Sequence, residues 1–229
     1  YRYGANPLSG VQQPDKYIVD TSLQIGVLRG LSLTIDAPVE TKVSENRQGV
    51  RDTDSGVDDV DFTLKWRVYQ DDSGGIDTLR IALLGGVRLD TSRRDDFNAN
   101  PHLGIVFTKV FGRHGLNFDT SYTLTTGGDR DDNFGGEGPA DAWRYNLAYV
   151  YRIFPDAFTA DSTGAWYLTA ELNGILETNG DHELRFGPGI MYEGRRFGFE
   201  IMGQLPVYSR LDERAELEFG VGVGIRLLF

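Results

Sequence analysis

The chain has 229 residues, a formal net charge of -11, 40% hydrophobic residues and no cysteine. This length suits a single domain, and the negative charge argues against a nucleic-acid partner, which would need a basic surface. The absence of cysteine excludes disulfide frameworks, thiol catalysis and cysteine metal sites.

The composition favours strands and turns over membrane-spanning helices. The chain contains 29 glycines, 13 phenylalanines and 11 tyrosines, and its mean hydropathy is -0.34. Aromatic residues are common in strands, and glycines are common in the turns that join them. Because no run of about 18 apolar residues is present, the sequence predicts no transmembrane helix.

Alternation of apolar and polar residues predicts about eleven strands, each about ten residues long. In chain order they cover residues 19–27, 31–42, 59–68, 78–90, 103–111, 116–124, 143–153, 166–173, 183–192, 197–207 and 216–229. The last strand is the clearest, with Leu217, Phe219 and Val221 on one face and Glu216 and Glu218 on the other. Pro38 falls within the second strand, at a position that a central strand tolerates poorly.

The lengths of the predicted connections alternate between short and long. In bacterial barrels the short turns face the periplasm and the long loops face outward, so this alternation predicts which end of the barrel is which. Short connections are expected at residues 28–30, 71–75, 112–115 and 194–196, with a longer one at 155–164. Long, acidic external connections are expected at 45–56, 93–100, 127–141 and 210–214. The strand that ends at residue 28 runs toward the periplasm, so a strand running outward should precede it. We therefore expect residues 1–4 to be the end of that strand, most of which is missing from this sequence, and residues 5–16 to form an external loop. The chain opens without a signal peptide, so we expect a mature or truncated form.

Two fold classes share this alternation, the soluble β-sandwich or lipocalin-like barrel and the transmembrane barrel. The long apolar faces, with Trp and Tyr near the strand ends, favour the transmembrane barrel. Phe229 ends an amphipathic strand and resembles an outer-membrane assembly signal. We therefore predict an all-β fold: residues 1–229 form a single transmembrane antiparallel up-and-down β-barrel of about 12 strands in the outer membrane of a Gram-negative bacterium.

Several segments resemble the outer-membrane family named for the meta-pathway of phenol degradation. They are LRGLSLTIDAP, GVDDVDFTLKWRVY, IALLGGVRLDTS, FGPGIMYEGRRFGFEIMGQLPVYSRLD and GVGVGIRLLF. The chain departs from the family pattern at Asp90-Thr91, where members often have Pro-Thr-Gly, and in its very short first turn at residues 28–30. The resemblance implies a barrel that moves small, often hydrophobic or aromatic, compounds.

The polar face of the predicted strands is rich in ionisable residues. The candidates for lining a lumen and setting its selectivity are Asp61, Lys65, Arg67, Arg80, Arg88, Arg144, Arg152, Glu171, Arg185, Glu200, Glu218 and Arg226. They would either select solutes in an open channel or form cross-strand ion pairs that fill a narrow lumen. The sequence leaves both interpretations open.

Two acidic segments raise the question of a metal site. Asp129, Asp131 and Asn133 alternate as in a calcium-binding loop, but Phe134 replaces the required turn glycine and Ala140 replaces the bidentate glutamate. Residues 52, 54, 58 and 59 form a second group of aspartates. We expect solvated loops and neither a metal nor a cofactor.

Catalysis is not expected, because the histidines at positions 102, 114 and 182 lie near strand ends or turns and no spacing joins them to a serine. Two hypotheses remain: a channel for small solutes, and a structural or accessory barrel with a closed lumen in a larger envelope complex. The expected partners are outer-membrane lipid and lipopolysaccharide, the barrel-assembly machinery, and other envelope proteins in the second hypothesis.

Overall fold

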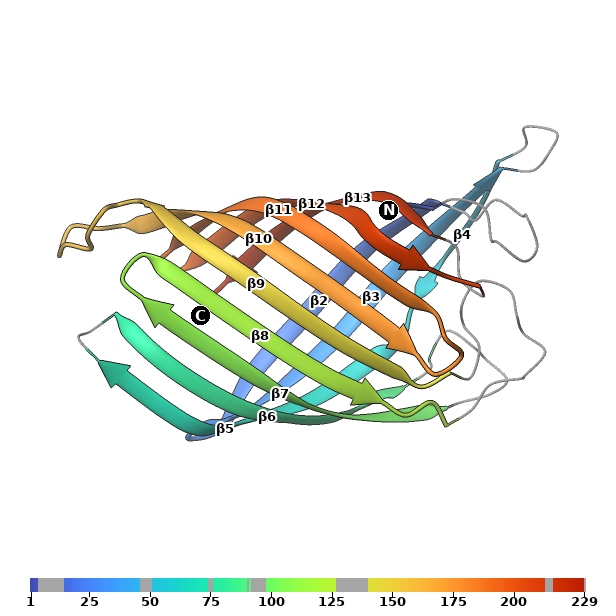
Figure 1. Cartoon of the computed structure of the whole chain (residues 1–229), viewed down its shortest axis with the longest axis horizontal. Coiled ribbons are helices and arrows are strands. Elements are labelled where there is room, and N and C mark those ends of the chain that lie inside the picture. Colours follow the sequence, from blue (N-terminus) through green and yellow to red (C-terminus); the bar gives the residue numbers. More distant parts are fainter. Residues whose placement is uncertain are drawn as a thin grey trace.

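The computed structural model describes residues 1–3, 15–45, 51–73, 76–89, 91, 98–126, 140–212 and 216–228. These residues form the 13 strands of one sheet (Figure 1). The strands are β1 (Arg2–Tyr3), β2 (Asp15–Leu28), β3 (Leu31–Glu45), β4 (Arg51–Val57), β5 (Val60–Ser73), β6 (Asp77–Leu89), β7 (Ala99–Phe111), β8 (His114–Thr123), β9 (Ala142–Phe154), β10 (Gly164–Glu177), β11 (His182–Gly194), β12 (Phe197–Arg210) and β13 (Leu217–Leu227).

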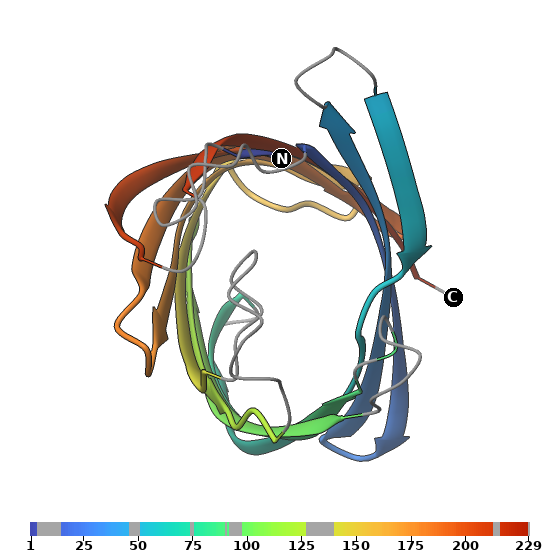
Figure 2. The same cartoon turned by 90° about the vertical axis from the view of Figure 1, so that its right-hand side faces the viewer.

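The sheet is an up-and-down antiparallel barrel, as the alternation predicted. From β5 to β13 each strand pairs with the next in the chain, and β3 joins β5 to β2. The strands cross the long axis at a tilt (Figure 1), and the view along that axis shows them curving around an oval interior (Figure 2). No helix in the described part of the chain is long and apolar enough to span a membrane.

The barrel is nearly closed, and β1 provides the contact between its first and last long strands. Arg2 lies opposite Phe219 on β13. On the other side, the Tyr1 amino group donates a hydrogen bond to the Lys16 carbonyl at 2.8 Å, and the Lys16 N–H donates to the Tyr1 carbonyl at 3.0 Å. Residues 1–3 therefore occupy the slot between β2 and β13, where the sequence predicted the end of a further strand.

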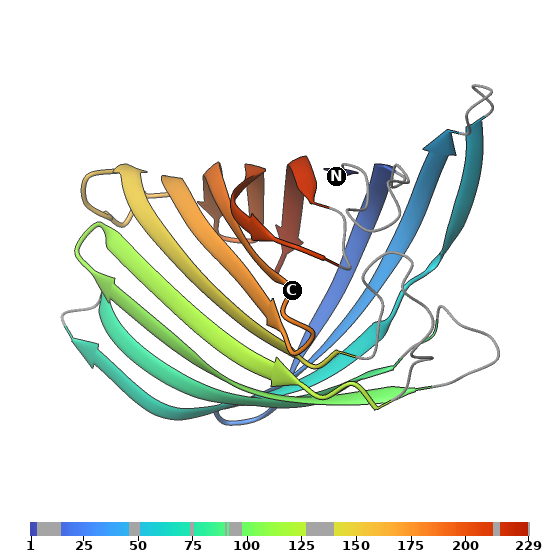
Figure 3. The same cartoon turned by 45° about the vertical axis from the view of Figure 1, so that its right-hand side comes forward.

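The expected long connection at residues 45–56 is wrong in part, because β4 lies within it. β4 pairs with β3 from Val39↔Val57 to Glu45↔Arg51, and the two strands project beyond the barrel wall (Figure 3). Pro38 lies where β3 changes partner from β5 to β4, and its carbonyl accepts a hydrogen bond from Asp58 N–H at 2.9 Å. The proline is tolerated because its missing N–H falls at this change of partner.

Glycine makes the tight turns possible at the end of the barrel opposite β4. Gly30 has φ +80° between β2 and β3, and Gly112 has φ +57° between β7 and β8, a region that other residues rarely adopt. Arg195 and Arg196 alone separate β11 from β12. The β9–β10 connection at residues 155–163 is longer: it extends past the ends of its strands (Figure 1) and lies across part of the opening in the view along the axis (Figure 2). We call this the short-turn end and the opposite end the β4 end.

The barrel has no large apolar core in its described part. The buried hydrophobic residues are Ala82, Val106, Ala142, Ala165, Leu211 and Leu217, mostly small or near the ends of strands. Large apolar side chains lie on the outside instead, as at Ile225, whose surface is 74% exposed, and Leu103, at 72%. A soluble sandwich would bury such side chains between its sheets, so the chain does not have that fold.

Candidate functional site

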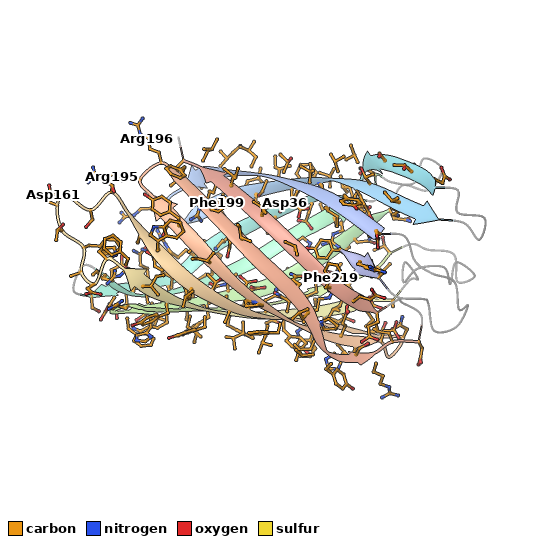
Figure 4. The ribbon with its side chains drawn as sticks, turned by 90° about the horizontal axis from the view of Figure 1, so that it is seen from above. Asp36, Asp161, Arg195, Arg196, Phe199 and Phe219 are labelled. Carbon is orange, nitrogen blue, oxygen red and sulfur yellow. The ribbon has the colours of Figure 1, made fainter. Side chains whose placement is uncertain are left out.

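The inner wall of the barrel is built from the polar face of each strand. The strand register places the polar residues of neighbouring strands opposite one another: Ser32 lies opposite Lys65, and Arg80 lies opposite Thr108. Because side chains of a strand alternate between the two faces, the polar residues of neighbouring strands meet inside. Asp36, labelled in Figure 4, belongs to this face and lines a cavity.

One part of the charged interior is a cavity of about 630 Å³ toward the β4 end, which we call the acidic chamber. Six aspartates line it, together with Arg88, Arg144 and His102. The aspartates are Asp20, Asp36, Asp58, Asp59, Asp61 and Asp119. Of the residues predicted for the lumen, the chamber brings together Asp61, Arg88 and Arg144. Its acidic excess attracts cations and opposes the entry of anions.

Asp61 is the centre of a polar network on the chamber wall. Its carboxylate lies 3.6 Å from the Arg88 guanidinium and 3.6 Å from His102 Nδ1. Thr63 donates its hydroxyl proton to Asp61 Oδ1 at 2.6 Å, and His102 Nε2 lies 2.9 Å from the same hydroxyl oxygen. A carboxylate, an imidazole and a hydroxyl thus meet in the interior.

Sequence reasoning missed this network, because it placed His102 near the start of a strand and looked only for a serine partner. The structure begins β7 at Ala99, so His102 lies within the strand. Gly86 was the available signal, because a glycine inside a strand often marks a close approach, and the structure pairs it with His102, whose ring needs that room. The Thr63 hydroxyl therefore links the Asp61 carboxylate to the His102 ring.

A second cavity, of about 410 Å³, lies at the short-turn end. Lys65, Arg67 and Arg80 contribute its charges, and Gln24, Ser32 and Thr108 contribute neutral polar groups. These three cations were predicted to share the lumen, and β5 and β6 bring them onto one stretch of wall.

A third cavity, of about 240 Å³, lies where the β9–β10 connection meets the inner wall. Arg152, predicted for the lumen, lines it and is only 5% exposed. The Arg152 guanidinium lies 4.3 Å from the centre of the Phe158 ring, within the range of a cation–π contact. Arg113 donates to Asp156 Oδ1 at 2.7 Å and so holds the start of this connection. Phe158 of the connection therefore covers Arg152 on the inner wall.

The other predicted lumen residues lie mainly on β10 to β13. Arg185 bonds the fully buried Glu183 at 2.6 Å, and Arg226 reaches Glu193 at 2.9 Å across Gly198 of the intervening strand. Glu200 accepts a weak hydrogen bond from Thr169 at 3.5 Å, and Glu171 is half-buried on the same wall. Arg185 and Arg226 are therefore committed to ion pairs.

The alternation breaks at the start of β13. Arg2 is opposite Phe219 whereas Tyr3 is opposite Leu217, so Glu218 is an extra, bulged residue. Glu218 pairs with Arg2 at 2.9 Å, with both side chains about half exposed. Leu217, predicted to face outward, has no exposed surface, and its N–H donates to Glu183 at 3.4 Å. A bulge reverses the face of the residues beyond it, which explains the wrong prediction for Leu217.

The outer surface is apolar between two bands of aromatic residues. His182 contacts both Tyr145 and Tyr208 near the β4 end. Toward the short-turn end a second band contains Phe111, His114, Tyr149, Tyr151, Trp166, Tyr192 and Phe197. Between these bands the exposed residues are mainly Leu, Ile and Val. Phe199 and Phe219 lie on β12 and β13, the strands nearest the viewer in Figure 4.

Some predicted positions lie outside the described residues: Asp129, Asp131 and Asn133 of the calcium-like segment, and Phe229 of the assembly signal. The second acidic group is divided, because residues 52 and 54 are on β4 whereas Asp58 and Asp59 line the acidic chamber. Among the residues that the structure describes, no three carboxylate or histidine side chains are arranged to hold a metal ion.

Comparison with known proteins identifies one family. Residues 15–210 match the family described as "Putative MetA-pathway of phenol degradation", so the match runs from β2 to the end of β12. No curated protein matches the chain. The matched segment includes the walls of all three cavities, and the barrel fold fits an outer-membrane barrel family.

Proposed function

This chain belongs to that phenol-degradation family, and on this premise we propose that it is an outer-membrane channel for small solutes, hydrophobic or aromatic compounds among them. It would act without catalysis or a cofactor. Its partners would be outer-membrane lipid, lipopolysaccharide and, during biogenesis, the barrel-assembly machinery.

One observation carries the proposal: the wall is apolar outside and charged inside. Valine, leucine and isoleucine side chains cover the outer face between two aromatic bands, an arrangement suited to hydrocarbon between two lipid interfaces. The inner face presents carboxylates, guanidinium groups and cavities of about 630 and 410 Å³. A hydrated, charged interior of this size suits passage of small solutes.

A second function is favoured by the ion pairs on the inner wall. Asp61 with Arg88 joins neighbouring strands, and Glu193 with Arg226 joins β11 to β13. Glu183 and Arg185 form a further ion pair within β11, and the β9–β10 connection covers Arg152 on the inner wall. Such links would also stiffen a closed barrel that serves as an accessory subunit of an envelope complex.

Conductance separates the two functions. Purified protein in a planar lipid bilayer is expected to give discrete current steps. Arg80→Gln and Arg88→Gln, separately and together, are expected to shift the reversal potential in a KCl gradient toward cation selectivity, since each variant removes a positive charge from the inner wall.

The matched control is Arg29→Gln with Arg196→Gln, which removes the same charge at the short turns between β2 and β3 and between β11 and β12, where Figure 4 labels Arg196. This control is expected to keep the reversal potential of the unmodified protein. A folded barrel that stays electrically silent and copurifies with envelope proteins would instead support the accessory function. If both lumen variants conduct with the reversal potential of the unmodified protein, the assignment of these arginines to the conducting path is contradicted.

A further inference from the structure

Three cations share one stretch of the inner wall at the short-turn end. Lys65 and Arg67 stand two residues apart on β5 and so share a face, and Arg80 follows on the neighbouring strand β6. Residues that are diagonal neighbours on adjacent strands have Cβ atoms roughly 7–8 Å apart, close enough for long side chains to approach one group. We call Lys65, Arg67 and Arg80 the basic cluster.

Little negative charge balances the basic cluster within the described part of the chain. No carboxylate lines its cavity, which is completed by neutral residues such as Gln24, Ser32 and Thr108. Asp72 lies 3.6 Å from Arg80, but its oxygens also accept hydrogen bonds from Gln70 and Thr78, and both ion-pair partners are about half exposed. Neither Lys65 nor Arg67 has an ion-pair partner among the described residues.

This imbalance is unusual in a chain with a net charge of -11. Other cations of the inner wall lie beside carboxylates: Arg88 is beside Asp61, and Arg226 is beside Glu193. Like charges held close together repel, and an anion bound among them removes the repulsion while gaining charge-assisted hydrogen bonds. The geometry therefore suits an anionic ligand.

The neutral part of the lining indicates which anions fit best. Ala82 and Val106 give the cavity an apolar side, whereas Ser32 and Thr108 supply hydroxyl groups. The cavity measures about 410 Å³, which is room for a small organic molecule and more than an inorganic ion requires. We propose that the basic cluster binds small organic anions with an apolar body, such as aromatic carboxylates.

This inference deepens the proposed channel function and rests on it for the route by which the anion reaches the site. The chamber toward the β4 end is acidic, so the two ends of the interior carry opposite charge. The basic cluster would give an organic anion a favourable position at the short-turn end after it has passed the aspartates.

Titration calorimetry with benzoate on the folded, detergent-solubilised protein tests the proposal without requiring an open channel. The unmodified protein is expected to bind benzoate. Lys65→Gln combined with Arg67→Gln should weaken binding at least about tenfold, since two charge-assisted contacts are lost. Benzylamine, of similar size but opposite charge, is expected neither to bind this cavity nor to displace benzoate.

Arg195→Gln combined with Arg196→Gln is the matched control, and it should keep the benzoate affinity of the unmodified protein. Heat-modifiable mobility on gels verifies that each variant is folded. Absence of benzoate binding to the folded protein would overturn the inference, as would equal binding by the Lys65/Arg67 variant. If benzoate binds but the protein does not conduct, the anion site is supported and only the channel function is contradicted. If the protein conducts but does not bind benzoate, the channel function stands and the anion site is overturned.

Discussion

Val223→Arg is expected to destabilise the barrel in a lipid bilayer by about 2–4 kcal/mol, the usual cost of an arginine on the lipid face near the midplane. Val223 lies in the middle of β13, opposite Ile201, and 64% of its surface is exposed. If hydrocarbon covers this face, the new guanidinium must be buried in lipid or must distort the bilayer to reach water. Equilibrium unfolding by urea in phospholipid vesicles, followed by tryptophan fluorescence, measures the change.

Gly224→Arg is the matched control, because the next residue along β13 faces the interior. A Cβ at this position would meet only Glu200 Cβ, at 3.9 Å, so the interior has room for the start of the side chain. The added charge faces the polar interior, and we expect a change in unfolding free energy within about 1 kcal/mol. If Val223→Arg had no larger effect than Gly224→Arg, the outer surface would not be covered by lipid.

Gly86→Val is expected to be the most damaging substitution inside the barrel, with a loss of at least about 3 kcal/mol in unfolding free energy, at the upper end for overpacking. A Cβ at Gly86 would overlap the Phe62 backbone carbonyl and would lie 2.5 Å from His102 Nε2. The carbonyl belongs to the adjacent strand and cannot move without breaking the β5–β6 ladder. Urea unfolding and heat-modifiable gel mobility report the effect.

Gly26→Val controls for placing a branched residue at an inward glycine, because no atom lies within 4 Å of a Cβ there. Gly26→Val is expected to remain folded. Gly86→Ala, alone and combined with His102→Ala, separates the two sources of overlap. The second substitution should restore only the part of the stability lost through the imidazole. Full recovery of stability in that double variant would show that the ladder can move, contrary to our expectation.

The family match and the alternation of residues agree on the fold, and the physical reason is simple. A strand in a barrel exposes successive residues to two different environments, so the pattern of a single strand already assigns its faces. Lys65, Arg67 and Arg80 were predicted for the polar face on this basis, and each lines the cavity at the short-turn end. Their shared environment follows from the short link between β5 and β6.

Local exceptions were not predictable in this way. Nothing in the alternation shows that Glu218 is bulged, because the bulge depends on how β1 pairs with β13. The pattern of β3 likewise does not reveal that β4 pairs with its residues 39–45, since β4 is an acidic segment with little apolar alternation. The bulge depends on a partner strand that lies at the other end of the chain, and the β3–β4 pairing involves a strand without an alternating pattern.

The amino-acid sequence by itself determined the strand order, the two faces of the wall and the end at which the short turns lie. These properties depend on the period of two residues and on local turn chemistry, which neighbouring residues specify. Only the tertiary structure decided which charges meet. Thr63 and His102 come together through β5, β6 and β7. The separation of an acidic chamber from a basic cluster depends on strand register and barrel curvature, which no single strand encodes.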